Sequence, residues 1–511
     1  MDTLEKAMKV MRETAVDEAD DLNKSEKKKK DENTIYTSFL ETPDFILEEI
    51  SSSPLSPDSP FIPGETELEF VKYSKLNDTF ERVRETTYCE KIYKPITDKI
   101  VLKGGVGLPT GVTDYENTSE IINQIRDFLI KYVQLPTFYE NLLPQLVLFY
   151  WVYEKFPFVP YLHFIGGTGT GKTTAMETLG SICYKPIDTT GSLTIASLFR
   201  LATSWKGTLL IDEFNTVGGE ESGEMISFLK SGVSNRLIFR TEGEKKKEVE
   251  VYIVKSPKVF TSENPITDAG LQSRTLEIKM DKNNRRVPLY KLPHYHQEAQ
   301  EIRNKLLLWR LRNFAKVDLS KIEFGYPELE PFDRRVQQIL TPIYYFSDDA
   351  ARKQIAVFAK EQEIETKRQR RESLDGLIFE VIYDHYKMPT TTDLALSTIV
   401  GIVNKTATKY PITERKLAGI VRKVLGIDTK RVGTGGEKET ILLFEGKEEL
   451  IEEKAIYFGL SYPEISGESV QCGEPGTMKT TSPRKVTPQP TQPPQEEVAQ
   501  SVEEEQEGIP F

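Results

Sequence analysis

The chain has 511 residues, of which 38% are apolar and 29% are charged, and its formal net charge is −12. This length is sufficient for two to four domains, and the composition is typical of a soluble protein. The sequence contains no apolar run of roughly 18 residues, and its charged N-terminus lacks the apolar stretch of a signal peptide, so we expect no membrane partner. The net charge neither predicts nor excludes DNA binding, because a total hides local patches.

The three cysteines, Cys89, Cys183 and Cys472, lie far apart and match no metal-ligand spacing. This usage favours a reducing, cytoplasmic location without a disulfide framework.

We expect two small regions before the main domain. Residues 1–64 contain a lysine run at 27–30 and a Ser/Pro-rich stretch at 51–57, which predict a disordered tail with a solvated charge block. Residues 65–118 show short alternating runs, including 68–73 and 99–102, and predict a small β-rich module. No convincing primase site is found among residues 1–119.

A phosphate-binding loop follows helical residues 119–153. The sequence of residues 166–174, Gly-Gly-Thr-Gly-Thr-Gly-Lys-Thr-Thr, fits G-x-x-x-x-G-K-[ST], with a predicted strand at 161–165 and a helix at 174–182. The loop's N–H groups and the helix N-terminus would hold the phosphates of ATP, and Lys172 would reach the β- and γ-phosphates. The predicted ATP-binding residues are Gly166, Gly167, Thr168, Gly169, Thr170, Gly171, Lys172, Thr173 and Thr174.

A second motif, roughly 40 residues further on, completes the predicted site. The apolar run 209–211 ends in Asp212 and Glu213, as a buried strand that presents two carboxylates would. We expect Thr173 and Asp212 to hold Mg²⁺, and Glu213 to polarise the attacking water. Strand-like and helix-like segments alternate from about 160 to 280, which predicts a parallel α/β core, and helices at 298–314 and 332–346 would form a helical lid.

The order of these motifs resembles that of AAA+ ATPases, and more narrowly of the helicase-like ATPases of mobile elements that are often joined to primases. The resemblance spans about residues 119–346 and lies in Phe128–Pro160, Gly166–Thr173, Ser197–Arg200, Thr208–Glu213, Ser256–Phe260, Ser273–Arg274, Asp333–Arg335 and Leu340–Pro342. It implies that Asn264 orients the hydrolytic water and that Arg274 is an arginine finger for the neighbouring subunit. It also implies that Arg334 or Arg335 is a lid arginine that senses nucleotide, and that the chain forms a homo-hexamer.

Two features point to DNA. Residues 235–240 and 249–254 predict a β-hairpin whose tip carries Lys245, Lys246 and Lys247, and similar ring helicases place such a hairpin in the pore, where it grips single-stranded DNA. An exposed charged turn is the alternative. After a charged helical connector at 347–373, residues 374–460 have the pattern of a winged helix, suited to duplex DNA or, alternatively, to protein contacts only. Its candidate DNA-binding residues are Arg415, Lys416, Arg422, Lys423, Lys430 and Arg431.

Residues 461–511 are rich in Pro, Gln and Glu and predict a disordered tail. Its acidic end, closed by Ile509, Pro510 and Phe511, resembles the tip of bacterial single-stranded-DNA-binding proteins. The resemblance implies docking of replication or repair proteins.

The expected fold is therefore an α/β P-loop AAA+ core with a parallel sheet and a helical lid, followed by a winged-helix domain, with disordered tails at both ends. The expected function is ATP-driven translocation on DNA by a replicative helicase of a mobile genetic element. An AAA+ loader or remodelling switch that acts on DNA-bound partners shares the same ATP site and is the alternative. A DNA-binding regulator ranks last, because the predicted set of water-activating residues favours turnover.

Overall fold

A computed structural model describes residues 33–55, 66–189, 194–214, 220–242, 248–282, 285–323, 325–388, 393–406, 411–433 and 439–460. Chain contacts separate residues 1–461 from residues 462–511, and every described residue belongs to the first unit. This unit has mixed α/β architecture with many helices. Among the described residues, no helix combines the length and apolar character needed to cross a membrane.

The first sheets lie partly inside the segment that we expected to be disordered. A four-stranded antiparallel sheet has the order β2 (Phe39–Glu41), β3 (Phe45–Ser51), β4 (Leu68–Ser74) and β5 (Thr79–Val83). A three-stranded sheet joins β1 (Thr34–Tyr36), β7 (Lys91–Lys94) and β6 (Thr86–Tyr88).

The expected boundaries at 64 and 65 are therefore wrong, because the β-rich module already begins at β1. Every residue of β3 is buried, including Glu48 and Glu49. These two acids interrupt the apolar pattern by which the sequence would otherwise predict a buried strand. Residues 99–102 were also counted among the short runs of the predicted β-rich module, but they form the short helix α2 (Lys99–Leu102). The carboxylate of Asp98 caps this helix by accepting from two backbone N–H groups.

A five-stranded parallel sheet follows, in the order β14 (Thr275–Lys279), β8 (Tyr161–Ile165), β13 (Lys258–Ser262), β10 (Leu209–Ile211) and β9 (Ile187–Asp188). The ends of these strands define two sides of the sheet. We call the side after Ile165, Ile211 and Ser262 the carboxyl end, and the side before Tyr161 and Thr275 the amino end.

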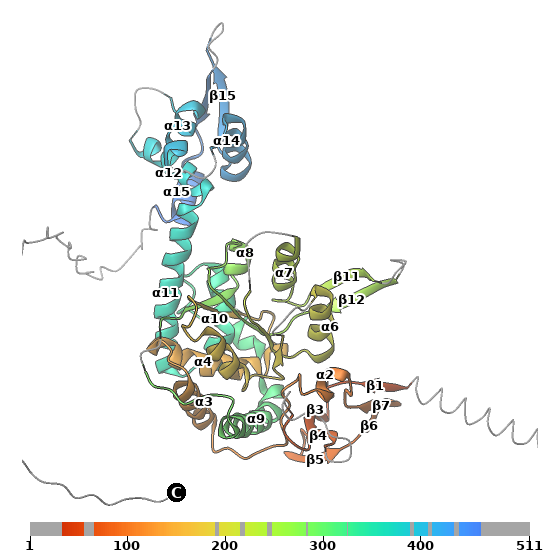
Figure 1. The fold of residues 1–511 in the computed structure, drawn as a ribbon. Coiled ribbons are helices and arrows are strands. Elements are labelled where there is room, and N and C mark those ends of the chain that lie inside the picture. Colours follow the sequence, from red (N-terminus) through yellow and green to blue (C-terminus); the bar gives the residue numbers. More distant parts are fainter. Residues whose placement is uncertain are drawn as a thin grey trace, which may run out of the picture. The chain divides into compact units, whose positions relative to one another are not determined.

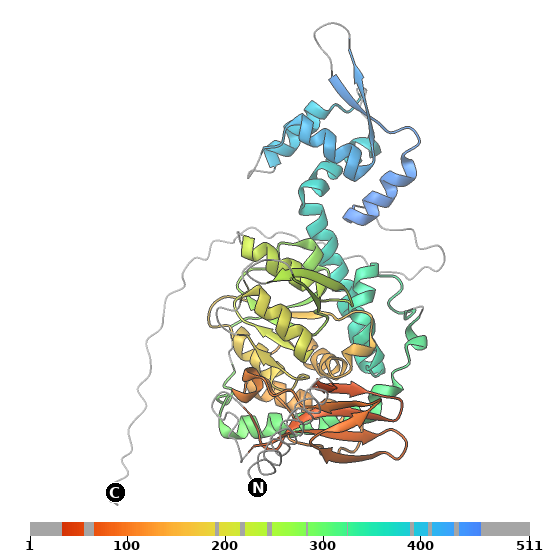
Figure 2. The same ribbon diagram turned by 90° about the vertical axis from the view of Figure 1, so that its right-hand side faces the viewer.

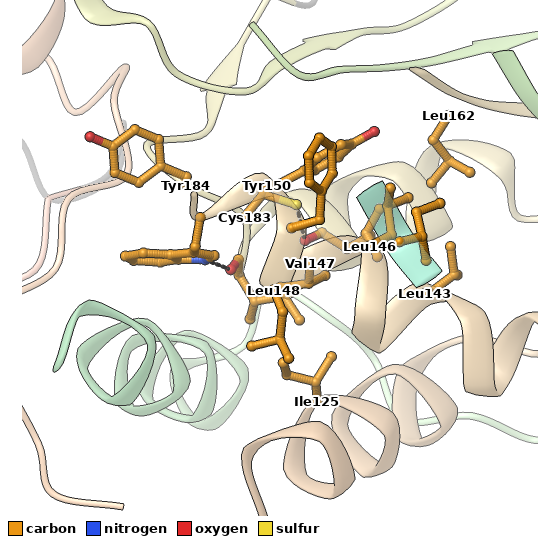
Figure 3. Packing of buried hydrophobic residues seen from close by; sticks show 14 of the residues in the cluster. Ile125, Leu143, Leu146, Val147, Leu148, Tyr150, Leu162, Cys183 and Tyr184 are labelled. Carbon is orange, nitrogen blue, oxygen red and sulfur yellow. Dashed lines mark hydrogen bonds between the residues drawn. The ribbon is translucent and has the colours of Figure 1, made fainter. Parts of the chain in front are cut away.

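Helices cover both faces of this sheet. Successive side chains of a strand point to opposite faces, and those of β8 are buried in two different apolar clusters. On β8, Leu162 and Phe164 belong to one apolar cluster and Tyr161 to a second. The first cluster includes residues of α3 (Thr118–Tyr132), α4 (Thr137–Tyr150), α5 (Lys172–Gly180) and α9 (Pro293–Asn313). Figure 3 shows its dense packing around α4. The second includes residues of α6 (Ile195–Trp205) and α7 (Glu220–Ser231).

A hairpin, a short helix and two further helices complete this part of the chain. The hairpin joins β11 (Leu237–Glu242) to β12 (Glu248–Ile253), and α8 (Ala269–Gln272) precedes β14. Beyond α9, α10 (Arg334–Tyr345) and α11 (Asp349–Glu372) pack against α4, where Phe358 stacks on Phe138 with ring centroids 5.1 Å apart. Three helical turns, η1 (Tyr153–Lys155), η2 (Phe314–Lys316) and η3 (Leu319–Ile322), lie between these elements.

The last described residues have an apolar core of their own. Helices α12 (Leu374–Lys387), α13 (Leu396–Thr406) and α14 (Glu414–Ile420) precede a π-helical turn, η4 (Val421–Leu425), the antiparallel strands β15 (Asp428–Val432) and β16 (Glu439–Leu443), and helix α15 (Glu448–Phe458). Their buried residues form one cluster that includes Ile378, Ile399 and Leu442. Figure 2 shows β15 and β16 side by side beyond these helices.

Candidate active site

The glycine-rich loop leaves the carboxyl end of the buried strand β8 and enters α5. Gly169 and Gly171 adopt positive φ angles of 78° and 85°, in the left-handed region that favours glycine. A Cβ on Gly166 would lie 2.5 Å from the carbonyl oxygen of Met280, so this position is closed to any larger residue. The ammonium group of Lys172 donates to the carbonyl oxygen of Gly167 at 2.8 Å. The loop therefore precedes a nine-residue helix whose N-terminus, with its free N–H groups, favours an anion.

The two predicted Mg²⁺ ligands lie next to each other. The Oγ1 atom of Thr173, at the start of α5, donates to the carboxylate of Asp212 at 3.1 and 3.2 Å from its two oxygens. Asp212 follows β10, so the two residues come from separate elements at the carboxyl end of the sheet. Hydroxyl and carboxylate oxygens are ligands that Mg²⁺ accepts, and this pair fits such an ion.

Thr261 organises the acid pair, and the sequence analysis did not identify it. Its buried hydroxyl donates to the Oδ1 atom of Asp212 and accepts the backbone N–H of Glu213 at 3.0 Å. In the sequence Thr261 looks like an ordinary residue of a buried strand, and only the pairing of β13 with β10 reveals its position.

Glu213 has an unusual backbone conformation. Its φ angle is 53°, which costs a non-glycine residue about 1–3 kcal/mol, and such strain persists only where the surroundings impose it. The hydrogen bond from the N–H of Glu213 to the Thr261 hydroxyl holds this backbone conformation from one side. On the other side, Phe214 N–H donates to the carbonyl oxygen of Thr261 at 2.7 Å, and the buried Phe214 ring packs on Phe260. The Glu213 side chain itself is exposed beside the loop.

The segment after β13 borders the loop as well. Glu263 accepts a hydrogen bond from the Thr168 hydroxyl at 2.8 Å, and Asn264 is exposed at the same end of the sheet. A series of hydrogen bonds that begins at the buried His163 holds the backbone at Asn264. His163 Nε2 lies 2.7 Å from the hydroxyl of Ser262, which donates to the carbonyl oxygen of Asn264. β13 lies between β8 and β10, so Asn264 follows a strand placed between the loop and the acid pair.

Two further residues that the sequence analysis missed touch the loop helix. Lys291 pairs with Glu177 at 2.9 Å, and the Tyr290 hydroxyl interacts with Thr174 and Glu177. Burial raises the pKa of Tyr290, so this hydroxyl stays protonated.

Arg274 lies at the other end of the sheet. Its carbonyl oxygen accepts the N–H of Tyr161, the first residue of β8, whereas the glycine-rich loop follows the last residue of that strand. Five residues of strand separate the two ends by roughly 16 Å. Arg274 is therefore too far away to reach a nucleotide held by the loop of the same copy.

The two candidates for the lid arginine lie at the start of α10. Burial and then the charges of Arg335 and Arg236 lower the pKa of Arg274, which shows that these three arginines lie near one another. Arg335 is exposed on the first turn of α10 and donates to Gln338, while Arg334 donates to Gln337. The charge of Arg335 therefore acts on Arg274.

The candidate DNA contacts are placed only in part. Arg415, Lys416, Arg422, Lys423, Lys430 and Arg431 are all exposed, on α14, the π-helical turn and β15. Lys245, Lys246 and Lys247, and the terminal Ile509, Pro510 and Phe511, lie outside the described residues.

Comparisons with known proteins found distant structural likenesses. No family model and no curated protein matches the sequence. Among solved structures, an apo structure of the NrS-1 C-terminal region is 11% identical, with a TM-score of 0.37, and the match covers 78% of this chain and 95% of that chain. An A-form apo structure of the same region is 12% identical, with a TM-score of 0.35 and coverage of 73% and 93%. Likeness at this level supports no functional assignment.

Proposed function

We propose that this chain is an ATP-driven DNA-translocating motor, a ring-forming replicative helicase whose parallel sheet belongs to an AAA+ core. The arrangement of Thr173, Asp212, Thr261 and Glu213 beside the glycine-rich loop is the observation that carries the proposal. It combines a loop suited to binding phosphate, two oxygen ligands suited to Mg²⁺ from Thr173 and Asp212, and the carboxylate of Glu213, whose backbone is strained. These are the components that hydrolysis of a nucleoside triphosphate requires.

Each residue has a distinct role in this proposal. The loop's N–H groups bind phosphate oxygens, and Lys172 exchanges the carbonyl oxygen of Gly167 for the β- and γ-phosphates. Thr173 and Asp212 would hold Mg²⁺, which neutralises phosphate charge when bound. Glu213 accepts a proton from the attacking water, and Asn264 orients that water.

The position of Arg274 supports the proposal of a ring. Because it lies at the amino end of the sheet, this arginine reaches a γ-phosphate only on a neighbouring copy. The contact joins one end of each copy to the opposite end of the next, and such head-to-tail contacts close into rings when the rotation permits. The AAA+ resemblance favours a hexamer.

Contact with DNA is assigned to two basic surfaces. The lysines at 245–247, which belong to the hairpin loop in the sequence, would grip single-stranded DNA in the pore. The exposed basic residues of α14, the π-helical turn and β15 suit duplex DNA, and this part of the chain would act as a winged helix. The terminal Ile-Pro-Phe would dock replication or repair proteins.

DNA-stimulated ATP turnover tests the proposal and separates it from the loader alternative. We expect single-stranded DNA to accelerate hydrolysis several-fold in the wild type. Substituting Lys245, Lys246 and Lys247 with alanine should abolish this acceleration and leave hydrolysis without DNA unchanged. An equal response of the wild type and the triple variant would contradict a pore role and favour a loader.

A further inference from the structure

The β11–β12 hairpin has one covered face and one bare face. Its inner face packs on α6, where Tyr252 lies 5.4 Å from the Phe199 ring and the Arg240 guanidinium lies 4.7 Å from the same ring. Figure 1 shows the hairpin beside α6. The outer face carries five exposed apolar side chains, whose exposed fractions range from 40% to 64%: Leu237, Phe239, Val249, Val251 and Ile253.

The strand register makes these side chains one continuous surface. Leu237 is paired with Ile253, and Phe239 with Val251, while Val249 is opposite Thr241. Residues two apart along a strand share a face, so all five point the same way. A two-stranded hairpin is at best marginally stable alone, and a contiguous apolar patch of this kind marks an interaction site.

The base of the hairpin belongs to a positively charged region. Arg236 immediately precedes β11, and its charge acts on Arg274 together with that of Arg335. The hairpin starts at the amino end of the sheet, since Val233 accepts the N–H of Val159 just before β8. Asp268 also lies near Arg274, but it is paired with Lys230 at 3.0 Å.

The carboxyl end of the same sheet carries several acidic residues, together with Lys172 and Lys279. Asp212, Glu213 and Glu263 follow β10 and β13 there, and both glutamates are exposed. These acids and the arginines at the amino end are complementary in a head-to-tail arrangement of identical copies. The hairpin's outer face begins one residue after Arg236, so it continues the surface that would meet a neighbour.

We propose that the outer face of the hairpin is a subunit contact, in which these apolar side chains pack against a second copy of this chain. The inference rests on the proposed function in one respect, that Arg274 acts on the nucleotide of a neighbour. Single-stranded DNA fits this face less well, because four of its five side chains are aliphatic and cannot stack on bases as aromatic residues do.

Assembly of the full chain tests this contact. We would measure sedimentation velocity over a range of protein concentrations with a non-hydrolysable ATP analogue, for the wild type and the double variant Phe239→Ser/Val251→Ser. Phe80→Ser is the matched control, because Phe80 is also a strand phenylalanine, 47% exposed, in a different sheet. Circular dichroism melting checks that each variant is folded.

The expected result is assembly of the wild type and of Phe80→Ser at the same concentration, with about ten-fold or more protein required by the double variant. Below the concentration at which either protein assembles, the double variant should bind the analogue as tightly as the wild type, because the glycine-rich loop lies at the other end of the sheet. Equal assembly of all three proteins, or a wild type that stays monomeric, would overturn the contact. Equal assembly with weaker binding of single-stranded DNA would identify DNA as the occupant instead. Hydrolysis by Glu213→Gln tests the proposed function separately, because sedimentation with the analogue requires no turnover.

Discussion

Replacing Thr261 with valine removes a hydroxyl and retains the side chain's shape. The hydroxyl donates to Asp212 and accepts the N–H of Glu213, so valine removes one hydrogen bond from each. Asp212 keeps the bond from Thr173, and the N–H of Glu213 keeps its bond to the Oδ1 atom of Asp212 at 3.1 Å. A hydrogen bond to a charged group contributes about 1.5–3 kcal/mol. If this interaction acts mainly on the transition state, the loss corresponds to a fall in kcat of roughly 10- to 150-fold.

The assay is steady-state ATP hydrolysis together with a direct titration of nucleotide binding. We expect Thr261→Val to lower kcat with little change in KM or in nucleotide affinity, because the residue positions Asp212 and Glu213 and does not touch the phosphate loop. Thr208→Val is the matched control. Thr208 is equally buried and bonds to a neutral carbonyl oxygen, that of Tyr184, at the amino end of β10.

Two results would refute this reasoning. A kcat for Thr261→Val within about two-fold of the wild type would show that the hydroxyl does not position the acids. An equal fall in Thr208→Val would show that loss of any buried threonine hydroxyl slows hydrolysis through stability alone. A thermal melt of both variants separates these explanations.

Three further outcomes are expected. Lys172→Ala should weaken ATP binding about ten-fold or more in a fluorescent nucleotide titration, whereas the exposed Lys353→Ala should not. Arg310→Leu removes the buried guanidinium that pairs with Glu48 and Glu154, although Glu48 keeps Lys185, and it should lower the free energy of unfolding by about 3–5 kcal/mol in urea. Arg312→Leu breaks a pair with the exposed Asp78 and should cost less than about 1 kcal/mol. Burial raises the pKa of Glu49 from 4.5 to about 8. Between these two pH values the folded state keeps the proton on Glu49, whereas the unfolded state has released it. The contribution of Glu49 to the free energy of unfolding should therefore fall by about 1.4 kcal/mol per pH unit between about pH 5 and pH 7. Glu49→Gln, measured at both pH values, should lack this dependence on pH.

Local patterns predicted much of the central sheet and its surroundings. The loop at 166–174 is a contiguous motif, and the helix after it begins at Lys172, two residues before the expected start. The proximity of Thr173 and Asp212 could be predicted too, because residues that follow parallel strands meet at one end of the sheet. The hairpin strands, expected at 235–240 and 249–254, lie at 237–242 and 248–253.

Features that depend on neighbours distant in sequence could not be predicted in this way. Glu48 and Glu49 interrupt the apolar pattern of β3, and their burial is intelligible only beside partners such as Lys185 and Arg310, far along the chain. Thr261 is a typical strand residue until β13 is paired with β10. The location of Arg335 near Arg274 likewise depends on how α10 packs, which no local spacing encodes.

The most direct test of the central claim measures movement along DNA. Streptavidin bound to the biotinylated end of single-stranded DNA dissociates faster when a motor pushes against it. The account predicts ATP-dependent displacement by the wild type and none by Glu213→Gln, although the variant should still bind ATP. Hydrolysis by the wild type without displacement from either end of the strand would contradict a translocating motor.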